Sequence, residues 1–128
     1  MPKAIVVDDS KTIRMILKRV LTEAGFEVCE AGNGREALEV LQVQDGAVTL
    51  ALIDWNMPEM NGMELLTELR RQPAFSSIKV IMVTTEAEIG HMSSALQAGA
   101  DEYVMKPFTK EILMEKLQLA GVLSYSNC

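Results

Sequence analysis

The 128-residue chain contains only two cysteines, Cys29 and Cys128, which form neither a CxxC pair nor a metal-ligand spacing. A disulfide framework or a cysteine metal site is therefore not expected. Basic residues are also few, because 12 Lys and Arg stand against 18 Asp and Glu, for a formal net charge of −6. Nucleic-acid binding requires a basic surface that neutralises phosphates, so this charge balance argues against a nucleic-acid partner.

Long apolar runs are missing as well. The longest are far shorter than the roughly 20 residues that span a bilayer, and the amino-terminal sequence MPKAIVVDD lacks the layout of a signal peptide. We therefore expect a cytoplasmic protein without a transmembrane segment. A chain of this length with 48% hydrophobic residues suits one domain with a sizeable core.

Short apolar segments alternate with amphipathic segments along the whole chain. The predicted strands are AIVV, FEVCE, TLALI, KVIMV and EYVM, at residues 4–7, 26–30, 49–53, 79–83 and 102–105. Three of them are nearly continuous apolar runs, which is typical of parallel strands covered on both faces. Five βα units in succession predict an α/β fold: a doubly wound, flavodoxin-like (βα)5 parallel sheet with strand order 2-1-3-4-5.

Polar residues at capping positions indicate where most of the helices begin. They are Ser10, Asn33, Asn61 and Thr109. Each of the two asparagines is followed three residues later by a glutamate, which is the spacing of a capping box. The segment 87–98 contains a glycine and two serines, so we expect one helix there and expect it to be the least stable.

Polar side chains follow the predicted strands at their carboxyl ends, the edge where parallel α/β sheets bind ligands. Asp8 and Asp9 follow the first strand, Asp54 the third, Thr84 the fourth and Lys106 the fifth. The first and third strands are neighbours in the predicted order, so three carboxylates would converge on one pocket. Their repulsion has to be offset by a divalent cation, a lysine, or a proton held at a raised pKa.

Phosphoryl transfer is one reaction for which this pocket contains the required groups. Mg²⁺ binds through one or two carboxylates together with water and phosphate oxygens. Lys106 would place a positive charge near a phosphoryl oxygen, and the Thr84 hydroxyl could donate to another. An aspartate could then act as the nucleophile that accepts the phosphoryl group.

Four motifs at these positions occur together in one known family. They are VVDDS, LIDWNMPEMNG, VTTE and YVMKPF, at residues 6–10, 52–62, 83–86 and 103–108. At these spacings they resemble the receiver domain of two-component response regulators, and most of all its single-domain chemotaxis members that bind the flagellar motor. The resemblance covers about residues 3–120. We therefore expect a receiver domain over residues 1–121 and a short tail over residues 122–128.

The resemblance implies roles for the acidic residues and the lysine. Asp54 would be the phosphoacceptor, exposed so that the phosphohistidine of a partner can reach it. Asp9, Asp54 and the backbone carbonyl of Asn56 would bind Mg²⁺, and Asp8 would assist through a water molecule. Lys106 would contact the phosphoryl group, and the peptide bond that follows it, before a proline, would be cis.

The same resemblance implies residues that transmit and time the signal. Thr84 would move toward the phosphoryl group, and Tyr103 would turn inward behind it. Asn56 and Glu86 stand two residues after the phosphoacceptor and two after the switch threonine. This pairing resembles the chemotaxis type that dephosphorylates itself quickly, because small polar side chains leave the in-line approach of water to phosphorus open.

Several functions remain open at this level. The resemblance implies a histidine kinase or phosphotransfer domain as phosphodonor and a monomer that acts in trans, on a flagellar motor switch protein. Catalysis would be limited to its own phosphorylation and dephosphorylation. One alternative is a phosphorelay or adaptation receiver with another partner, because the segment EAEIGHM is more acidic than in relatives that have lysines there. A Mg²⁺-dependent phosphatase is a remote alternative, since such an enzyme needs a second acid/base aspartate where Asn56 stands.

The only tryptophan and the only histidine are expected to differ in importance. Trp55 follows the candidate phosphoacceptor directly, so we expect a half-exposed indole beside the site. His91 lies in the weak helical segment, where we expect a solvent-exposed residue without a special role.

Overall fold

Five strands pair in parallel in the order β2-β1-β3-β4-β5, as the sequence predicts. The computed structural model describes residues 1–123. Its strands are β1 (Lys3–Val7), β2 (Glu27–Ala31), β3 (Val48–Asp54), β4 (Lys79–Thr84) and β5 (Glu102–Met105). Its α-helices are α1 (Lys11–Glu23), α2 (Gly34–Gln44), α3 (Gly62–Arg71), α4 (Met92–Gln97) and α5 (Lys110–Leu119), and a 3₁₀ helix, η1 (Glu86–His91), precedes α4.

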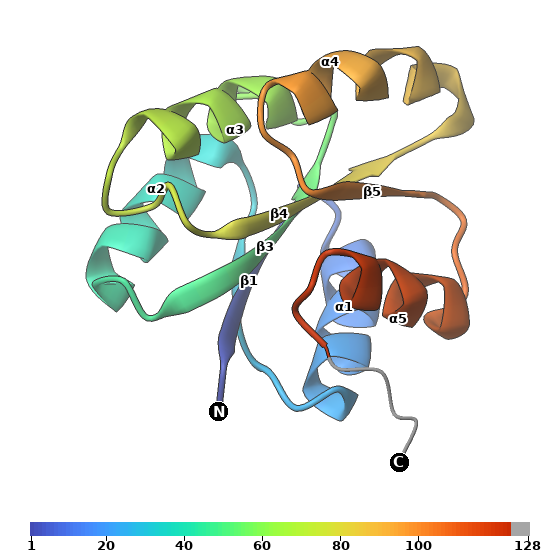
Figure 1. Ribbon diagram of the computed structural model, residues 1–128, viewed down its shortest axis with the longest axis horizontal. Helices are drawn as coiled ribbons and strands as arrows, with labels where there is room; N and C mark the ends of the chain where they lie inside the picture. The colour runs from blue at the N-terminus through green and yellow to red at the C-terminus, as the bar shows by residue number, and fades with distance from the viewer. Residues whose placement is uncertain (124–128) are drawn as a thin grey trace.

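The sheet separates two layers of helices (Figure 1). Helices α2, α3 and α4 cover one face, and α1 and α5 cover the other. Because side chains alternate along a strand, β1 supplies Ile5 and Val7 to the first layer and Ala4 and Val6 to the second. Two hydrophobic cores result, one on each face of the sheet.

The central strands are buried along nearly their whole length, whereas the edge strands are not. Strands β1, β3 and β4 are the three apolar runs of the sequence, and each is paired on both sides. Strands β2 and β5 lie at the two edges and contain partly exposed positions. The expectation that these apolar runs are parallel strands covered on both faces is confirmed.

The predicted helix starts are confirmed, with one change of detail. At the start of α3, Asn61 accepts from the backbone N–H of Glu64 at 2.9 Å, and the Glu64 carboxylate accepts from that of Asn61 at 3.0 Å. At the start of α2, Asn33 accepts from the N–H of Glu36 at 2.8 Å, but the Glu36 carboxylate accepts from Gly32 instead, at 3.2 Å. The predicted capping box is therefore incomplete there, because the glutamate bonds one residue further back.

The fourth helical segment differs from the prediction. Instead of one helix over 87–98, the chain forms the 3₁₀ turns of η1 and then the six residues of α4. At the start of η1 the Glu88 carboxylate accepts from the backbone N–H of Thr85 at 3.3 Å and from its hydroxyl at 3.0 Å. Gly90, Ser93 and Ser94 disfavour a continuous α-helix, and this poor propensity explains the division.

Gly62, the first residue of α3, presses against the backbone at the end of β3. A Cβ atom there would lie 2.6 Å from the carbonyl oxygen of Asp54 and 2.9 Å from Cα of Trp55. The N–H of Gly62 donates to the Trp55 carbonyl at 3.0 Å, and the N–H of Trp55 donates to the Val83 carbonyl at 2.9 Å. The backbone that follows Asp54 is thus fixed from two sides, and only glycine fits at position 62.

The carboxyl-terminal boundary of the domain stays a prediction. Val122 and Leu123, the first residues of the expected tail, pack against the core on the α1 and α5 face. Residues 124–128, including Cys128, lie outside the described residues, and Cys29 is a free thiol. Among residues 1–123, no helix has the length and apolar character that crossing a membrane would require.

We expect Gly62→Ala to lower the free energy of unfolding by about 1–3 kcal/mol, because the added methyl group meets backbone atoms that cannot turn away. Gly90→Ala is the matched control, since a Cβ atom there meets nothing within 4 Å. Urea unfolding of both variants measures the difference. Equal stability of the two would show that the close approach at position 62 does not constrain the fold.

Candidate functional site

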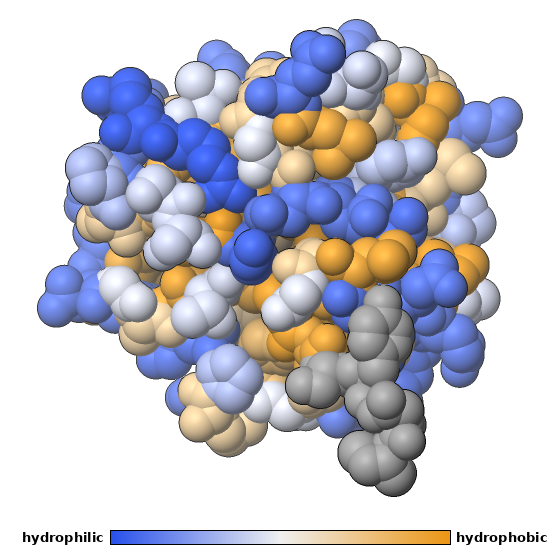
Figure 2. Space-filling model, in the orientation of Figure 1, coloured by the Kyte–Doolittle hydropathy of each residue, from blue (hydrophilic) through white to orange (hydrophobic). Residues whose placement is uncertain are grey.

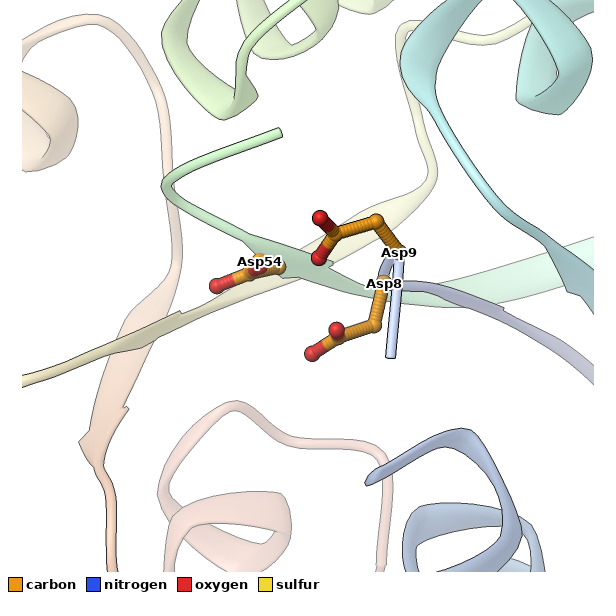
Figure 3. A group of neighbouring side chains, drawn as sticks. All are labelled: Asp8, Asp9 and Asp54. Carbon is orange, nitrogen blue, oxygen red and sulfur yellow. The ribbon is translucent and has the colours of Figure 1, made fainter. Parts of the chain in front are cut away.

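Three carboxylates converge at the carboxyl edge of the sheet, as the strand order predicts. Asp8 and Asp9 follow β1, and Asp54 is the last residue of β3. One oxygen atom from each lies within 4.8 Å of the others. Figure 3 shows the three side chains pointing toward the same side of the strand ends. This edge therefore brings together the acidic residues that the sequence places far apart.

The three carboxylates differ in exposure, and one expectation about them is wrong. Asp54 was expected to be exposed, but only 5% of its surface is accessible. The physical reason is that Asp54 still belongs to β3, where it lies opposite Val83 of β4. Asp8 is 1% exposed, whereas Asp9 is exposed to solvent. Asp9 is thus the most accessible carboxylate of the group.

Lys106 offsets part of this negative charge. It follows β5, and its Nζ atom donates to Asp8 Oδ2 at 3.2 Å and to Asp54 Oδ1 at 3.3 Å. The peptide bond between Lys106 and Pro107 is cis, as the family resemblance implies. Lysine is one of the three possible ways to offset the repulsion, and the structure confirms that it is used.

A raised pKa is another of these ways. Burial, and next the charge of Asp8, raise the pKa of Asp54 from 3.8 to about 6, although Lys106 and the backbone N–H of Asn56 act in the opposite direction. Burial also acts to lower the pKa of Lys106, but the two carboxylates outweigh it and the net direction is upward. Near neutral pH the lysine therefore stays protonated, and the pKa of Asp54, about 6, lies close to that pH.

Asp8 is the most completely bonded of the three carboxylates. Its Oδ1 atom accepts from the backbone N–H of Ser10 at 2.8 Å, and Oδ2 accepts from Lys106. Its own backbone N–H donates to the carbonyl of Ala31 at 3.1 Å. Because both carboxylate oxygens already have partners, Asp8 acts in this structure as a fixed negative charge beside Asp54.

Thr84 and Tyr103 lie on the neighbouring strands β4 and β5. The Thr84 hydroxyl is fully buried and donates to the carbonyl of Thr85 at 3.3 Å, while the N–H of Lys106 donates to the Thr84 carbonyl at 2.6 Å. Tyr103 is partly buried, and Nζ of Lys116 lies 5.0 Å from the centre of its ring. Thr84 is thus the last residue of β4, Tyr103 of β5 lies opposite Met82, and their switching roles remain a hypothesis.

The two residues expected to set the lifetime of the phosphorylated state are both exposed. Asn56 lies in the loop between β3 and α3, and Glu86 is the first residue of η1. Both segments begin at the carboxyl edge, next to Asp54 and Thr84. Their effect on the approach of water to the site stays a prediction.

Trp55 and His91 form a contact that the sequence analysis missed. Their rings stack with centroids 5.1 Å apart and an interplanar angle of 14°. Trp55 is half-buried and His91 exposed, as expected, but the stack joins the loop after β3 to the end of η1. No spacing in the sequence signals this contact, because it depends on how η1 lies against the neighbouring loop.

The residues at this edge fit a hard divalent cation. Three carboxylates and one lysine leave a net negative charge, and oxygen atoms are the ligands that Mg²⁺ and Ca²⁺ prefer. Lys106 bonds to one oxygen atom each of Asp8 and Asp54, and the exposed carboxylate of Asp9 could supply a further oxygen ligand. The donor set therefore suits a cation that keeps water molecules and phosphate oxygens among its ligands.

The family model of the response regulator receiver domain matches residues 4–118. The chain therefore belongs to this family and is a phospho-receiver response regulator. Its members are signalling proteins and in general not catalytic enzymes. The match confirms the resemblance seen in the four sequence motifs.

Similar proteins agree with this assignment. The chemotaxis protein CheY1 of Helicobacter pylori is 45% identical over 118 residues, which are 91% of this chain and 94% of that protein. The chemotaxis protein CheY homolog of Campylobacter jejuni is 44% identical over 117 residues, which are 91% of this chain and 89% of that protein. The structure of the chemotaxis response regulator CheY4 of Vibrio cholerae has a TM-score of 0.83 at 35% identity, covering 94% of this chain and 98% of that one.

We expect Asp54→Asn to stabilise the protein at neutral pH when metal is removed by a chelator. The pKa of Asp54 is raised to about 6, so the folded state binds its proton more tightly than the unfolded state. This contribution to stability is present at low pH and is lost as the pH rises from about 4 to about 6. Asparagine does not ionise, so the variant does not lose this stability. At neutral pH its free energy of unfolding should exceed that of the wild type by about 1–3 kcal/mol.

Thermal or urea unfolding of the two proteins between pH 4 and pH 8 measures this difference. The stability of the wild type should fall relative to that of Asp54→Asn between about pH 4 and about pH 6 and then stay lower up to pH 8. Parallel pH profiles of the two proteins would contradict the raised pKa.

Proposed function

We propose that the chain accepts a phosphoryl group on Asp54 from a histidine kinase or phosphotransfer domain in the cytoplasm. We further propose that it then acts in trans as a chemotaxis regulator of the flagellar motor. The observation that supports this most directly is the contact of Asp54 with Lys106 beside two further carboxylates. The names of the similar chemotaxis proteins support the choice of pathway.

Asp54 has the properties of a nucleophile for this transfer. With a pKa of about 6 it is mostly ionised at neutral pH, yet it retains more basicity than an ordinary carboxylate. One of its oxygens would form the new bond to phosphorus while the bond between phosphorus and the donor's histidine nitrogen breaks. The imidazole of the donor is then the leaving group.

Lys106 and the acidic residues have complementary tasks in this proposal. The Nζ atom of Lys106 lies between Asp8 and Asp54, so it can pair with a phosphoryl oxygen on Asp54 without a large movement. Asp9, Asp54 and the backbone carbonyl of Asn56 would bind Mg²⁺, with Asp8 assisting. When bound, Mg²⁺ supplies positive charge that stabilises the phosphoryl oxygens during transfer.

Thr84 provides a route from the phosphoryl group to the surface. Its hydroxyl donates to the neighbouring Thr85 carbonyl and could instead donate to a phosphoryl oxygen after rotation. Its carbonyl accepts from the N–H of Lys106, so the ends of β4 and β5 are joined directly. A change at Thr84 would thereby bias the position of Tyr103 on β5, as expected for a local charge event that shifts a two-state element.

Exposed apolar side chains on one face are suited to binding the output partner. They belong to η1, α4, β5 and α5: Ile89, Leu96, Met105, Ile112 and Leu119. Figure 2 shows apolar patches over α4 and around α5 on the face toward the viewer. A partner that binds this face would read the state of the switch residues next to it.

A non-motor partner is the second candidate. The segment before α4 contains Glu86 and Glu88, which make this part of the surface acidic. A partner that recognises this surface would need basic residues opposite it. A phosphorelay or adaptation receiver is therefore the alternative to a regulator of the motor.

We expect beryllofluoride with Mg²⁺, which imitates the aspartyl-phosphate, to tighten binding of the protein to a flagellar motor switch peptide. Fluorescence of Trp55, the only tryptophan, reports activation in the same sample. Asp54→Asn is the control, and it should show neither tighter binding nor the activation signal. If the wild type is activated and the peptide still does not bind, the motor assignment is wrong and the receiver chemistry stands.

We expect a phosphorylated state that lasts well under an hour, because Asn56 and Glu86 leave the approach of water to phosphorus open. Glu86→Leu should lengthen this lifetime several-fold by shielding the site. Glu39→Leu, the same change at an exposed position on α2, is the matched control and should have no effect. Loss of the phosphoryl group after removal of a small phosphodonor measures the lifetime, and persistence for hours in the wild type would contradict this expectation.

A further inference from the structure

Arg14, in the first turn of α1, contacts the backbone of the acidic pair. Its Nη1 atom donates to the carbonyl oxygen of Asp8 at 2.6 Å. Its Nε atom donates to Glu30 at 3.1 Å, and the side chain is 19% exposed. The guanidinium thus joins α1, the end of β1 and strand β2 in one network.

The contact with the Asp8 carbonyl also fixes Asp9. The carbonyl of Asp8 and the nitrogen of Asp9 belong to one planar peptide unit, so a bond to the first determines the orientation of the second. The other groups of Asp8 already have partners: its N–H bonds to Ala31, and its carboxylate bonds to Ser10 and Lys106. Arg14 is therefore the group that orients the peptide unit between Asp8 and Asp9.

Glu30 keeps the guanidinium in this orientation. It accepts from Arg14 through one oxygen, and its other oxygen lies 3.5 Å from Nζ of Lys18. The planar guanidinium offers donors in two fixed directions, one toward Glu30 and one toward the Asp8 carbonyl. A lysine at position 14 would keep the charge but could not make both contacts with the same geometry.

We propose that Arg14 is a positioning residue for the cation site: it orients the Asp8–Asp9 peptide so that the Asp9 carboxylate meets those of Asp8 and Asp54. This inference rests on the proposed function, because it concerns the cation that the three carboxylates would bind. Arg14 does not touch the cation itself and acts through the backbone of its ligands.

Electrostatics alone makes the opposite prediction. Arg14 is positively charged and lies near the acidic cluster, so its removal should strengthen the binding of a divalent cation. If Arg14 positions Asp9, its removal should weaken that binding. The sign of the change in Mg²⁺ affinity therefore separates the two explanations.

The test is calorimetric titration of Mg²⁺ into the wild type and matched variants. We expect Arg14→Ala and Arg14→Lys each to weaken Mg²⁺ binding about tenfold, as is common for residues that orient metal ligands. Glu30→Gln should weaken it to a smaller extent. Lys18→Ala is the control. Lys18 lies on the same helix and also contacts Glu30, but it has no bond to the Asp8 carbonyl. This variant should bind Mg²⁺ at least as tightly as the wild type.

Thermal unfolding of each variant in a chelator shows whether it is folded before Mg²⁺ is added. If Arg14→Ala does not fold, Arg14→Lys decides the question, because it keeps the positive charge and electrostatics alone then predicts no change in Mg²⁺ affinity. Wild-type affinity in the folded Arg14 variants would overturn the positioning role and leave the proposed function intact. Failure of the wild type to bind Mg²⁺ would overturn both the positioning role and the proposed cation site.

Discussion

The crowding of three carboxylates at one sheet edge is the constraint on which the site depends. Parallel strands end at a common edge, so acidic residues that follow β1 and β3 must meet there. Lys106 bridges Asp8 and Asp54, and the raised pKa of Asp54 shows that the lysine offsets only part of the repulsion and burial. The negative charge that remains favours the binding of a cation, and of a phosphoryl group together with a cation.

The backbone around this cluster is unusually well fixed. Gly62 presses against the end of β3, and the N–H of Trp55 bonds to β4, so the chain after Asp54 has little freedom. On the other strand, Asp8 is bonded through its amide and its carboxylate. The fixed backbone and the bonds of Lys106 thus hold the carboxylates of Asp8 and Asp54 side by side despite their repulsion.

The same edge connects to β5 and to η1. The carbonyl of Thr84 accepts from Lys106, which joins the strand that bears the proposed switch threonine to the strand that bears Tyr103. The stack of Trp55 on His91 joins the loop after Asp54 to η1, which forms 3₁₀ turns instead of an α-helix. The residues around Asp54 are thus in direct contact with both β5 and η1.

The order of apolar segments, capping residues and polar strand ends determined the fold class, the strand order and the convergence of Asp8, Asp9, Asp54 and Lys106. These features follow from local propensity and from the rule that parallel strands end together. The burial of Asp54 and the stack of Trp55 on His91 were decided only by tertiary structure. The burial of Asp54 depends on the pairing of β3 with β4, which continues one residue past the apolar run. The stack depends on how loops from different βα units lie against each other. Neither feature produces a periodic pattern in the sequence.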